Sequence, residues 1–159
     1  MITLSRSVNV FECCVLAAQR GGLARVFVLE SAPGFEGLRL AEDLREAHVD
    51  AEPIPDGDAG PRLGPASVSL VGADTVFADG AVVNKVGTRS LAEVTRSAGR
   101  PMYVACESIK IDPRSSERAW GATKFGGGTF DLTPPILIKG IFTDRGILRT
   151  DQVATARPR

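Results

Sequence analysis

The sequence predicts an α/β fold of three layers, in which a mostly parallel β-sheet is covered by helices on both faces. Short stretches that are apolar on both sides alternate with amphipathic helical stretches, and no long polar linker separates them. At 159 residues the chain has the size of one ordinary domain. We therefore expect one domain over residues 1–149, followed by a polar tail over residues 150–159.

The first half of the chain holds two strand–helix units. An apolar run over residues 1–4 precedes a helical stretch that the pair Gly21–Gly22 ends. The run ARVFVLES over residues 24–31 is apolar on both faces, as a buried parallel strand is. The stretch GLRLAEDLREAH then has the spacing of an amphipathic helix, and a weak strand follows over residues 49–54.

The second half continues this alternation. Residues 55–67 hold three Pro and three Gly, so we expect loop or irregular turn there. VSLVG is the next buried strand, and in the helix TRSLAEVTRSAG the residues Ser90 and Glu93 are spaced like a capping box. PMYVACES is another strand. After a long polar loop, TFDLTPPILIKGIFTDRGIL contains a last β-like run.

Composition and charge argue against several classes of protein. Nineteen basic and nineteen acidic residues are interspersed, which argues against direct nucleic-acid binding. No apolar run approaches the roughly 20 residues of a membrane span, and no secretory signal is present, so we expect the cytoplasm. The cysteines Cys13, Cys14 and Cys106 do not describe a disulfide framework. With His48 as the sole histidine, no zinc site or other metal site is expected.

Polar residues stand where the predicted strands end. In such sheets ligands bind beyond the carboxyl ends of the strands, and Ser5, Glu30, Asp74 and Glu107 each end or follow a strand. Asp74 follows its strand through the tight step Gly72–Ala73, which would place its carboxylate at this edge. The alternative is an Asp that only hydrogen-bonds the local backbone in a turn.

A second candidate is the segment Asn84–Thr88, which precedes a helix. Free N–H groups at the helix start, close approach at Gly87 and the charge of Lys85 would together form a phosphate cradle. The alternative is a capped helix start with an exposed lysine. The triplet Gly126–Gly128 is interpreted as a flexible connection, because it precedes an apolar strand and no Gly-Lys-Ser/Thr is present. No dinucleotide fingerprint follows a strand, so no cofactor is expected.

Four blocks of the sequence resemble a known family in order and spacing. They are VFVLESAPGFEGLRLAEDL, VGADTVFADGAVVNKVGT, PMYVACESIKID and FDLTPPILIKGIFTDRGIL. The chain resembles the α, β and δ subunits of initiation factor 2B and the related methylthioribose-1-phosphate and ribose-1,5-bisphosphate isomerases. The resemblance covers nearly the whole chain and implies the C-terminal, Rossmann-like domain of that family. It also implies that Asp74 matches the isomerases' catalytic acid/base, and that Asn84 and Lys85 match the pair that helps to hold a sugar phosphate.

The chain also departs from the isomerase pattern. Those enzymes have a catalytic Cys in the first strand–helix loop, where Ser5 stands here. A hydroxyl without an activating base does not exchange protons near neutrality as a thiol does. Ala32 replaces the family's Arg, which removes a positive group. Because Met1 falls where the Rossmann-like domain begins, we expect the family's helical N-terminal domain to be absent.

Two hypotheses of function follow. The main one is a non-catalytic domain like those of initiation factor 2B, which self-associates as a homodimer and has a sugar-phosphate or nucleotide pocket at Ser5, Asn84, Lys85 and Gly87. The alternative is an aldose–ketose isomerase acting on a sugar 1-phosphate, with Asp74 as its catalytic residue. A separate partner that supplies an N-terminal helical domain is a third expectation, and a role in translation rests on the resemblance alone.

Overall fold

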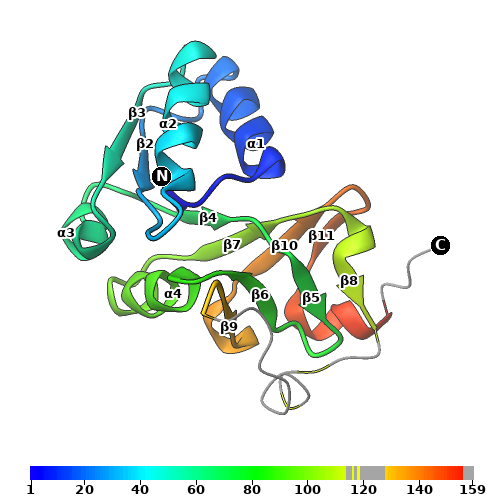
Figure 1. Cartoon of the computed structure of the whole chain (residues 1–159). Helices are drawn as coiled ribbons and strands as arrows, with labels where there is room; N and C mark the ends of the chain where they lie inside the picture. Colours follow the sequence, from blue (N-terminus) through cyan, green and yellow to red (C-terminus); the bar gives the residue numbers. More distant parts are fainter. Residues whose placement is uncertain (114–115, 117, 119–127, 156–159) are drawn as a thin grey trace.

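The structure, a computed structural model, describes residues 1–113, 116, 118 and 128–155 (Figure 1). Within these residues one sheet has seven strands in the order β11-β10-β7-β4-β1-β2-β3. The strands are β1 (Ile2–Leu4), β2 (Val26–Leu29), β3 (Ala51–Ile54), β4 (Ser69–Val71), β7 (Met102–Ala105), β10 (Gly140–Thr143) and β11 (Gly146–Leu148). Neighbouring strands pair in parallel except β10 and β11 at one edge, which confirms the predicted mostly parallel sheet.

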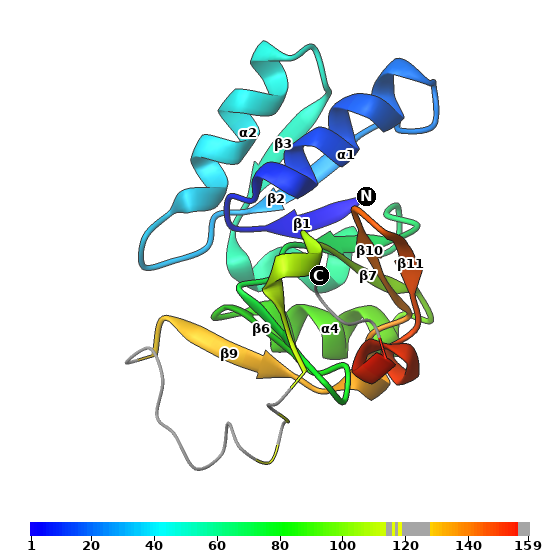
Figure 2. The same ribbon diagram turned by 90° about the vertical axis from the view of Figure 1, so that its right-hand side faces the viewer.

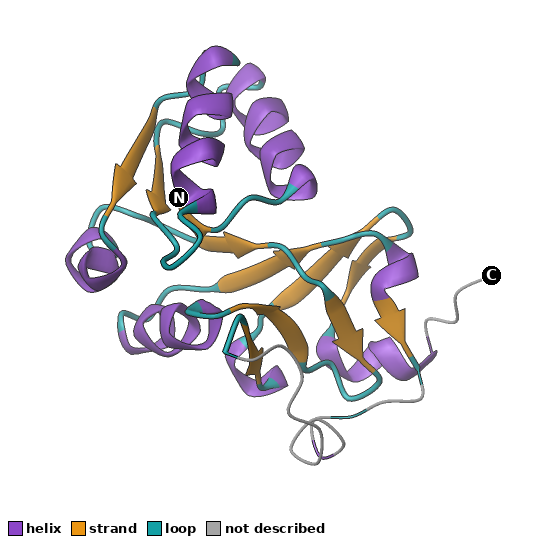
Figure 3. Ribbon diagram, in the orientation of Figure 1, coloured by secondary structure: helices purple, strands orange, loops and turns teal. Residues whose placement is uncertain are grey.

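Helices cover both faces of this sheet. The α-helices of the described residues are α1 (Val8–Gln19), α2 (Glu36–Glu46), α3 (Ala59–Arg62) and α4 (Thr88–Ser97). Figure 3 shows α1 and α2 on one side of the sheet and α4 on the other. Successive side chains of a strand point to opposite faces of the sheet, so β2 contributes to the cores on both sides. Val26 and Val28 pack in the core under α1 and α2, whereas Phe27 and Leu29 pack in the core on the opposite face. The three-layer prediction is confirmed.

A second, smaller sheet lies on the α4 side of the main sheet (Figure 1). It has four strands in the described residues, in the order β8-β5-β6-β9. They are β5 (Thr75–Phe77), β6 (Val82–Lys85), β8 (Ile111–Asp112) and β9 (Phe130–Thr133). The β5–β6 and β6–β9 pairs are antiparallel. The sequence does not predict this sheet, which brings Lys85 and Asp131 next to the ends of the main strands.

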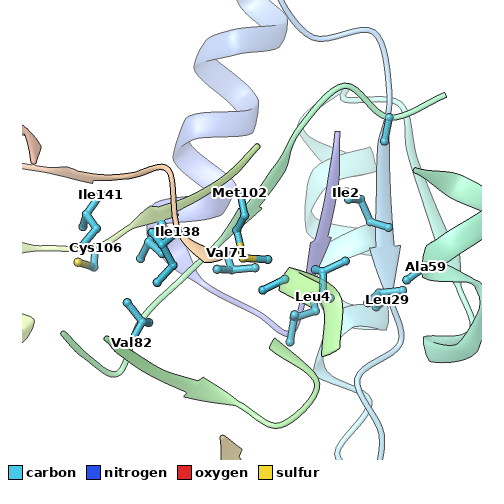
Figure 4. Close-up of a cluster of buried hydrophobic side chains, with 14 of the residues drawn as sticks. Ile2, Leu4, Leu29, Ala59, Val71, Val82, Met102, Cys106, Ile138 and Ile141 are labelled. Atoms are coloured by element: carbon cyan, nitrogen blue, oxygen red, sulfur yellow. The ribbon is translucent and has the colours of Figure 1, made fainter. Parts of the chain in front are cut away.

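The larger hydrophobic core fills the space between the main sheet, α4 and the small sheet (Figure 4). Ile2, Leu4, Met102 and Ile141 of the main strands are all nearly inaccessible to solvent. Val82 of the small sheet packs in the same core. Burying such side chains stabilises the fold by about 1.5–3 kcal/mol each, so this core fixes the small sheet against the main one.

Two segments differ from the prediction. Residues 55–67, expected to be loop, contain the 3-10 helix η1 (Asp56–Asp58) and α3, and Leu63 just after α3 is fully buried. The expected polar tail begins as the 3-10 helix η4 (Thr150–Thr155), because its one strongly apolar side chain, Val153, packs in the larger core. Residues 156–159 of that tail, and Gly126 and Gly127, lie outside the described residues.

No helix in the described part of the chain combines the length and the apolar character that a membrane crossing requires. The remaining short helices are η2 (Ser108–Lys110) and η3 (Pro135–Leu137), both 3-10 turns at strand ends.

Candidate functional site

A pocket of about 450 Å³ opens at the carboxyl ends of β1 and β4. These strands are neighbours, and the chain continues from them in opposite directions across the sheet. Such a switch point is where open α/β sheets bind ligands. Figure 2 shows the start of α1 above β1, with β6 and β9 below. Four of the predicted residues, Ser5, Asp74, Asn84 and Lys85, line this one pocket.

Ser5 lies at the end of β1 with a backbone φ of +59°, a conformation that residues other than glycine adopt infrequently. Its N–H donates a hydrogen bond of 2.6 Å to Ser31 Oγ, and the Ser31 hydroxyl donates to the carbonyl of Leu29 at 3.0 Å. Ser31 therefore connects the ends of β1 and β2. The Asp56 carboxylate accepts from the N–H groups of Ser31 and Ala32, so the loop after β2 is also held in place.

Lys85 ends β6 inside the pocket, and its side chain is only 7% exposed. Its Nζ lies 2.9 Å from Oε1 of Glu36, the first residue of α2. The hydrogen bond from Lys85 lowers the pKa of the Glu36 carboxyl, and partial burial opposes this effect only in part. The alternative of an exposed Lys85 is therefore wrong. No local signal in the sequence predicted Glu36 as a site residue, because it is separated from Lys85 by 49 positions.

Asn84 is buried beside Lys85 and is bonded to the start of α4. Its Nδ2 donates to Thr88 Oγ1 at 3.0 Å, and the Thr88 hydroxyl donates to the Lys85 carbonyl at 2.6 Å. These bonds fix the backbone that carries Lys85. Gly72, at the end of β4, approaches the N-cap Ser7 of α1 closely, because a Cβ there would lie 2.7 Å from Ser7 Oγ.

Gly87 does not join the other four predicted residues. It lines a different pocket, of about 510 Å³, between η1 and α4. Its N–H donates to Asp131 Oδ2 at 2.8 Å, and the N–H of Arg89 donates to the same atom at 3.1 Å. A carboxylate from β9 therefore already occupies the helix start that was predicted to cradle phosphate.

The start of α4 also differs from the predicted capping box. Gly87 is the N-cap with a φ of +100°, and Glu93 bonds Arg89 in place of a backbone N–H. Burial raises the pKa of Asp131, and the hydrogen bonds from the backbone N–H groups of Arg89 and Gly87 offset part of this effect. The cap comes from a residue 42 to 44 positions further along the chain, which no local sequence signal indicates.

Asp74 lies on the exposed rim of the pocket, and its backbone N–H donates to the Val83 carbonyl at 2.9 Å. The pocket also contains Glu107, which the sequence predicted at a strand end, and two charged residues that it did not predict, Arg6 and Lys110. Arg6 Nε donates to Asp43 Oδ2 at 2.7 Å. The rim of the pocket therefore carries positively and negatively charged side chains, and the Asp74 carboxylate is exposed to solvent.

The cysteines do not supply a nucleophile at this site. Burial raises the pKa of the Cys14 thiol to about 12 and that of Cys106 to about 11, so both stay protonated near neutrality. Burial also raises the pKa of Cys13. None of them lines the pocket around Lys85. Among the described residues no three His, Cys, Asp or Glu side chains are grouped to hold a metal ion.

A doubly wound α/β domain with a polar pocket at the switch point of its sheet belongs to the class of Rossmann-like domains. The chain belongs to the Initiation factor 2 subunit family, whose family model matches residues 1–125.

Relatives of two kinds match this chain. It is 38% identical to a translation initiation factor eIF-2B subunit 2-like protein of Pyrococcus abyssi, over 93% of this chain and 57% of that protein. It is 31% identical to a ribose 1,5-bisphosphate isomerase of Haloterrigena turkmenica, over 98% of this chain and 56% of the isomerase. The crystal structure of the Pyrococcus horikoshii translation initiation factor eIF-2B superposes with a TM-score of 0.85 at 35% identity, over 93% of this chain and 57% of that one. The chain thus spans about half the length of the curated relatives it matches.

Proposed function

We propose that this chain is a binding and assembly domain of the initiation factor 2B type, without catalysis of its own, whose pocket takes a phosphorylated sugar or a nucleotide. The observation that carries the proposal is the composition of the pocket at the switch point. Lys85 and Asn84 supply donors deep in it, and Ser5 stands where the resembling isomerases have a cysteine. The lining contains no histidine to activate the Ser5 hydroxyl.

Ligand binding is tested by thermal unfolding in the presence of ribose 1-phosphate, methylthioribose 1-phosphate, ribose 1,5-bisphosphate and nucleotides. A ligand held by the native state at 100 times its Kd adds about 2.7 kcal/mol of stability and raises Tm. We expect a rise with at least one of these ligands, and we expect Lys85→Ala to abolish it, because the ammonium that faces the pocket is lost. Lys139→Ala, which removes an exposed lysine outside the pocket, is the matched control. If no ligand raises Tm, or if both variants lose the rise equally, the pocket proposal is refuted.

An aldose–ketose isomerase is the second candidate, because Asp74, Ser5 and Lys85 line the same pocket and an isomerase is among the relatives. In that case Asp74 would move a proton of the sugar while Lys85 holds its phosphate. Acid/base work of this kind gains from an enclosed carboxyl group, whereas Asp74 is exposed. Turnover of a sugar 1-phosphate that falls at least 100-fold in Asp74→Asn would support this candidate. Turnover that Asp74→Asn leaves unchanged would eliminate Asp74 from catalysis.

For assembly we propose that the chain forms a homodimer through the β11 edge of the main sheet and works in the cytoplasm. The edge strand β11 presents Ile147, which is 67% exposed. Exposed apolar side chains beside an unpaired strand favour pairing with another chain. Light scattering that reports a monomer at high protein concentration would contradict this proposal. A separate helical partner remains a second proposal, which co-purification tests.

A further inference from the structure

The buried lysine of the pocket already has a carboxylate as its partner. Lys85 Nζ lies 2.9 Å from Glu36 Oε1, in the place where an oxygen of a bound phosphate would lie. Glu36 and Lys85 both line the pocket, so this ion pair is part of its wall. A phosphate that approaches Lys85 therefore meets a second anion on the same ammonium group, and the two anions repel each other.

The loop before α2 makes room for this carboxylate. A Cβ on Gly34 would lie 2.3 Å from Glu36 Oε1 and 2.9 Å from Oε2, so only a residue without a side chain leaves this place free. The backbone φ of Gly34 does not lie in the left-handed region that favours glycine. Glycine at this position thus leaves the space that the Glu36 carboxylate occupies, and a larger residue would displace this end of the flexible Glu36 side chain.

The other two cations of the pocket lining are more exposed than Lys85. Arg6 is bonded to Asp43, 2.7 Å away. Lys110 lies in η2, beyond the end of β7, and makes no ion pair among the described residues. Of the lysines in the lining, Lys85 is the buried one, and it is the one whose charge is compensated.

We propose that Glu36 is the specificity-determining residue of this pocket: its carboxylate occupies Lys85 in place of a ligand phosphate, so that phosphate dianions bind only by displacing it. This inference rests on the proposed function. It adds that the native pocket binds sugar phosphates more weakly than it would if the Lys85 ammonium group had no carboxylate partner.

The test measures the Kd of ribose 1-phosphate and of unphosphorylated ribose for the whole chain by calorimetry. Glu36→Gln removes the charge and keeps the size of the side chain. Gly34→Ala keeps the charge but displaces the carboxylate, because its Cβ takes the space of Oε1. Glu46→Gln makes the same substitution at the other end of α2, outside this pocket, and is the matched control.

We expect Glu36→Gln and Gly34→Ala each to bind ribose 1-phosphate at least tenfold more tightly than the native protein. We expect Glu46→Gln to bind it with the native Kd, and all variants to bind ribose alike. Adding Lys85→Ala to Glu36→Gln should remove the gain, because the gain requires the freed ammonium group.

The failures are distinguishable. If the native protein binds ribose 1-phosphate and Glu36→Gln binds it no more tightly, Glu36 only positions Lys85, and this inference is overturned while the proposed function stands. If neither binds it, this inference is overturned, and the proposed function is decided by the other ligands of the thermal unfolding test. A gain that persists in the double variant places the phosphate elsewhere and also overturns the inference.

Discussion

Replacing Gly37 with alanine is expected to prevent α2 from packing against β2 and to destabilise the protein by more than about 3 kcal/mol, which is at the severe end for a single substitution. Gly37 lies in the first turn of α2, and a Cβ there would lie 1.8 Å from the carbonyl oxygen of Leu29. The obstacle is backbone of a central strand, so it cannot rotate away as a side chain does. The Gly37 N–H also donates to the Glu30 carbonyl at 3.2 Å, and this bond would be lost.

The measurement is urea unfolding of Gly37→Ala beside Gly60→Ala. Gly60 lies inside α3, and a Cβ there would make only an ordinary contact of 3.6 Å with Val94. Alanine favours a helix over glycine by about 1 kcal/mol, so Gly60→Ala should be neutral or stabilising. Equal stability of the two variants would show that the close approach of α2 to β2 is not required for the fold.

The fold was predictable because its main elements carry their own signals. The stretch that contains β2 is apolar on both faces because Val28 packs under α1 and α2 while Leu29 packs in the opposite core. The small sheet gives no such signal. Its strands have two to four residues each, and β9 pairs with β6 across 45 to 51 positions of sequence, from the pair Lys85↔Phe130 to the pair Val82↔Thr133.

The sequence predicted those site residues whose positions follow from the ends of the strands. It did not predict those contacts that a side chain distant in the sequence makes. Ser5, Asp74 and Lys85 meet because the carboxyl ends of parallel strands, and the hairpin that follows one of them, lie at one edge. The local pattern around Gly87 equally predicted a free helix start. The actual partner of the Gly87 N–H is Asp131, which lies on β9 far along the chain. The partner of Lys85, Glu36, likewise lies on a distant element, α2. Long-range contacts of this kind follow from the packing of the layers, and a local sequence motif does not predict them.

Replacing Asp131 with alanine is expected to lower the stability of the protein by about 1–2 kcal/mol, since loss of an N-terminal cap costs about 0.5–2 kcal/mol. Asp131 Oδ2 accepts hydrogen bonds from the N–H groups of the N-cap Gly87 and of Arg89 in the first turn of α4. Hydrogen exchange should show that this turn loses protection. Because Asp131 pairs with Asn84 in the β6–β9 register, the same variant should also weaken ligand binding at the neighbouring Lys85.

Asp131→Asn separates the hydrogen bonds of this cap from its charge. The amide keeps an oxygen that accepts from the helix N–H groups, so most of the stability lost in the alanine variant should be retained. Burial raises the pKa of Asp131 in the native state, which means that the folded protein holds the ionised carboxylate less well than the unfolded chain does. Ionisation of Asp131 therefore lowers the stability of the native protein as the pH rises through this pKa, and the asparagine variant escapes that loss. Measured from about pH 3 to about pH 7, the stability difference should move in favour of Asp131→Asn. A difference that moves toward the native protein would show that the hydrogen bonds to the carboxylate outweigh the cost of burying its charge.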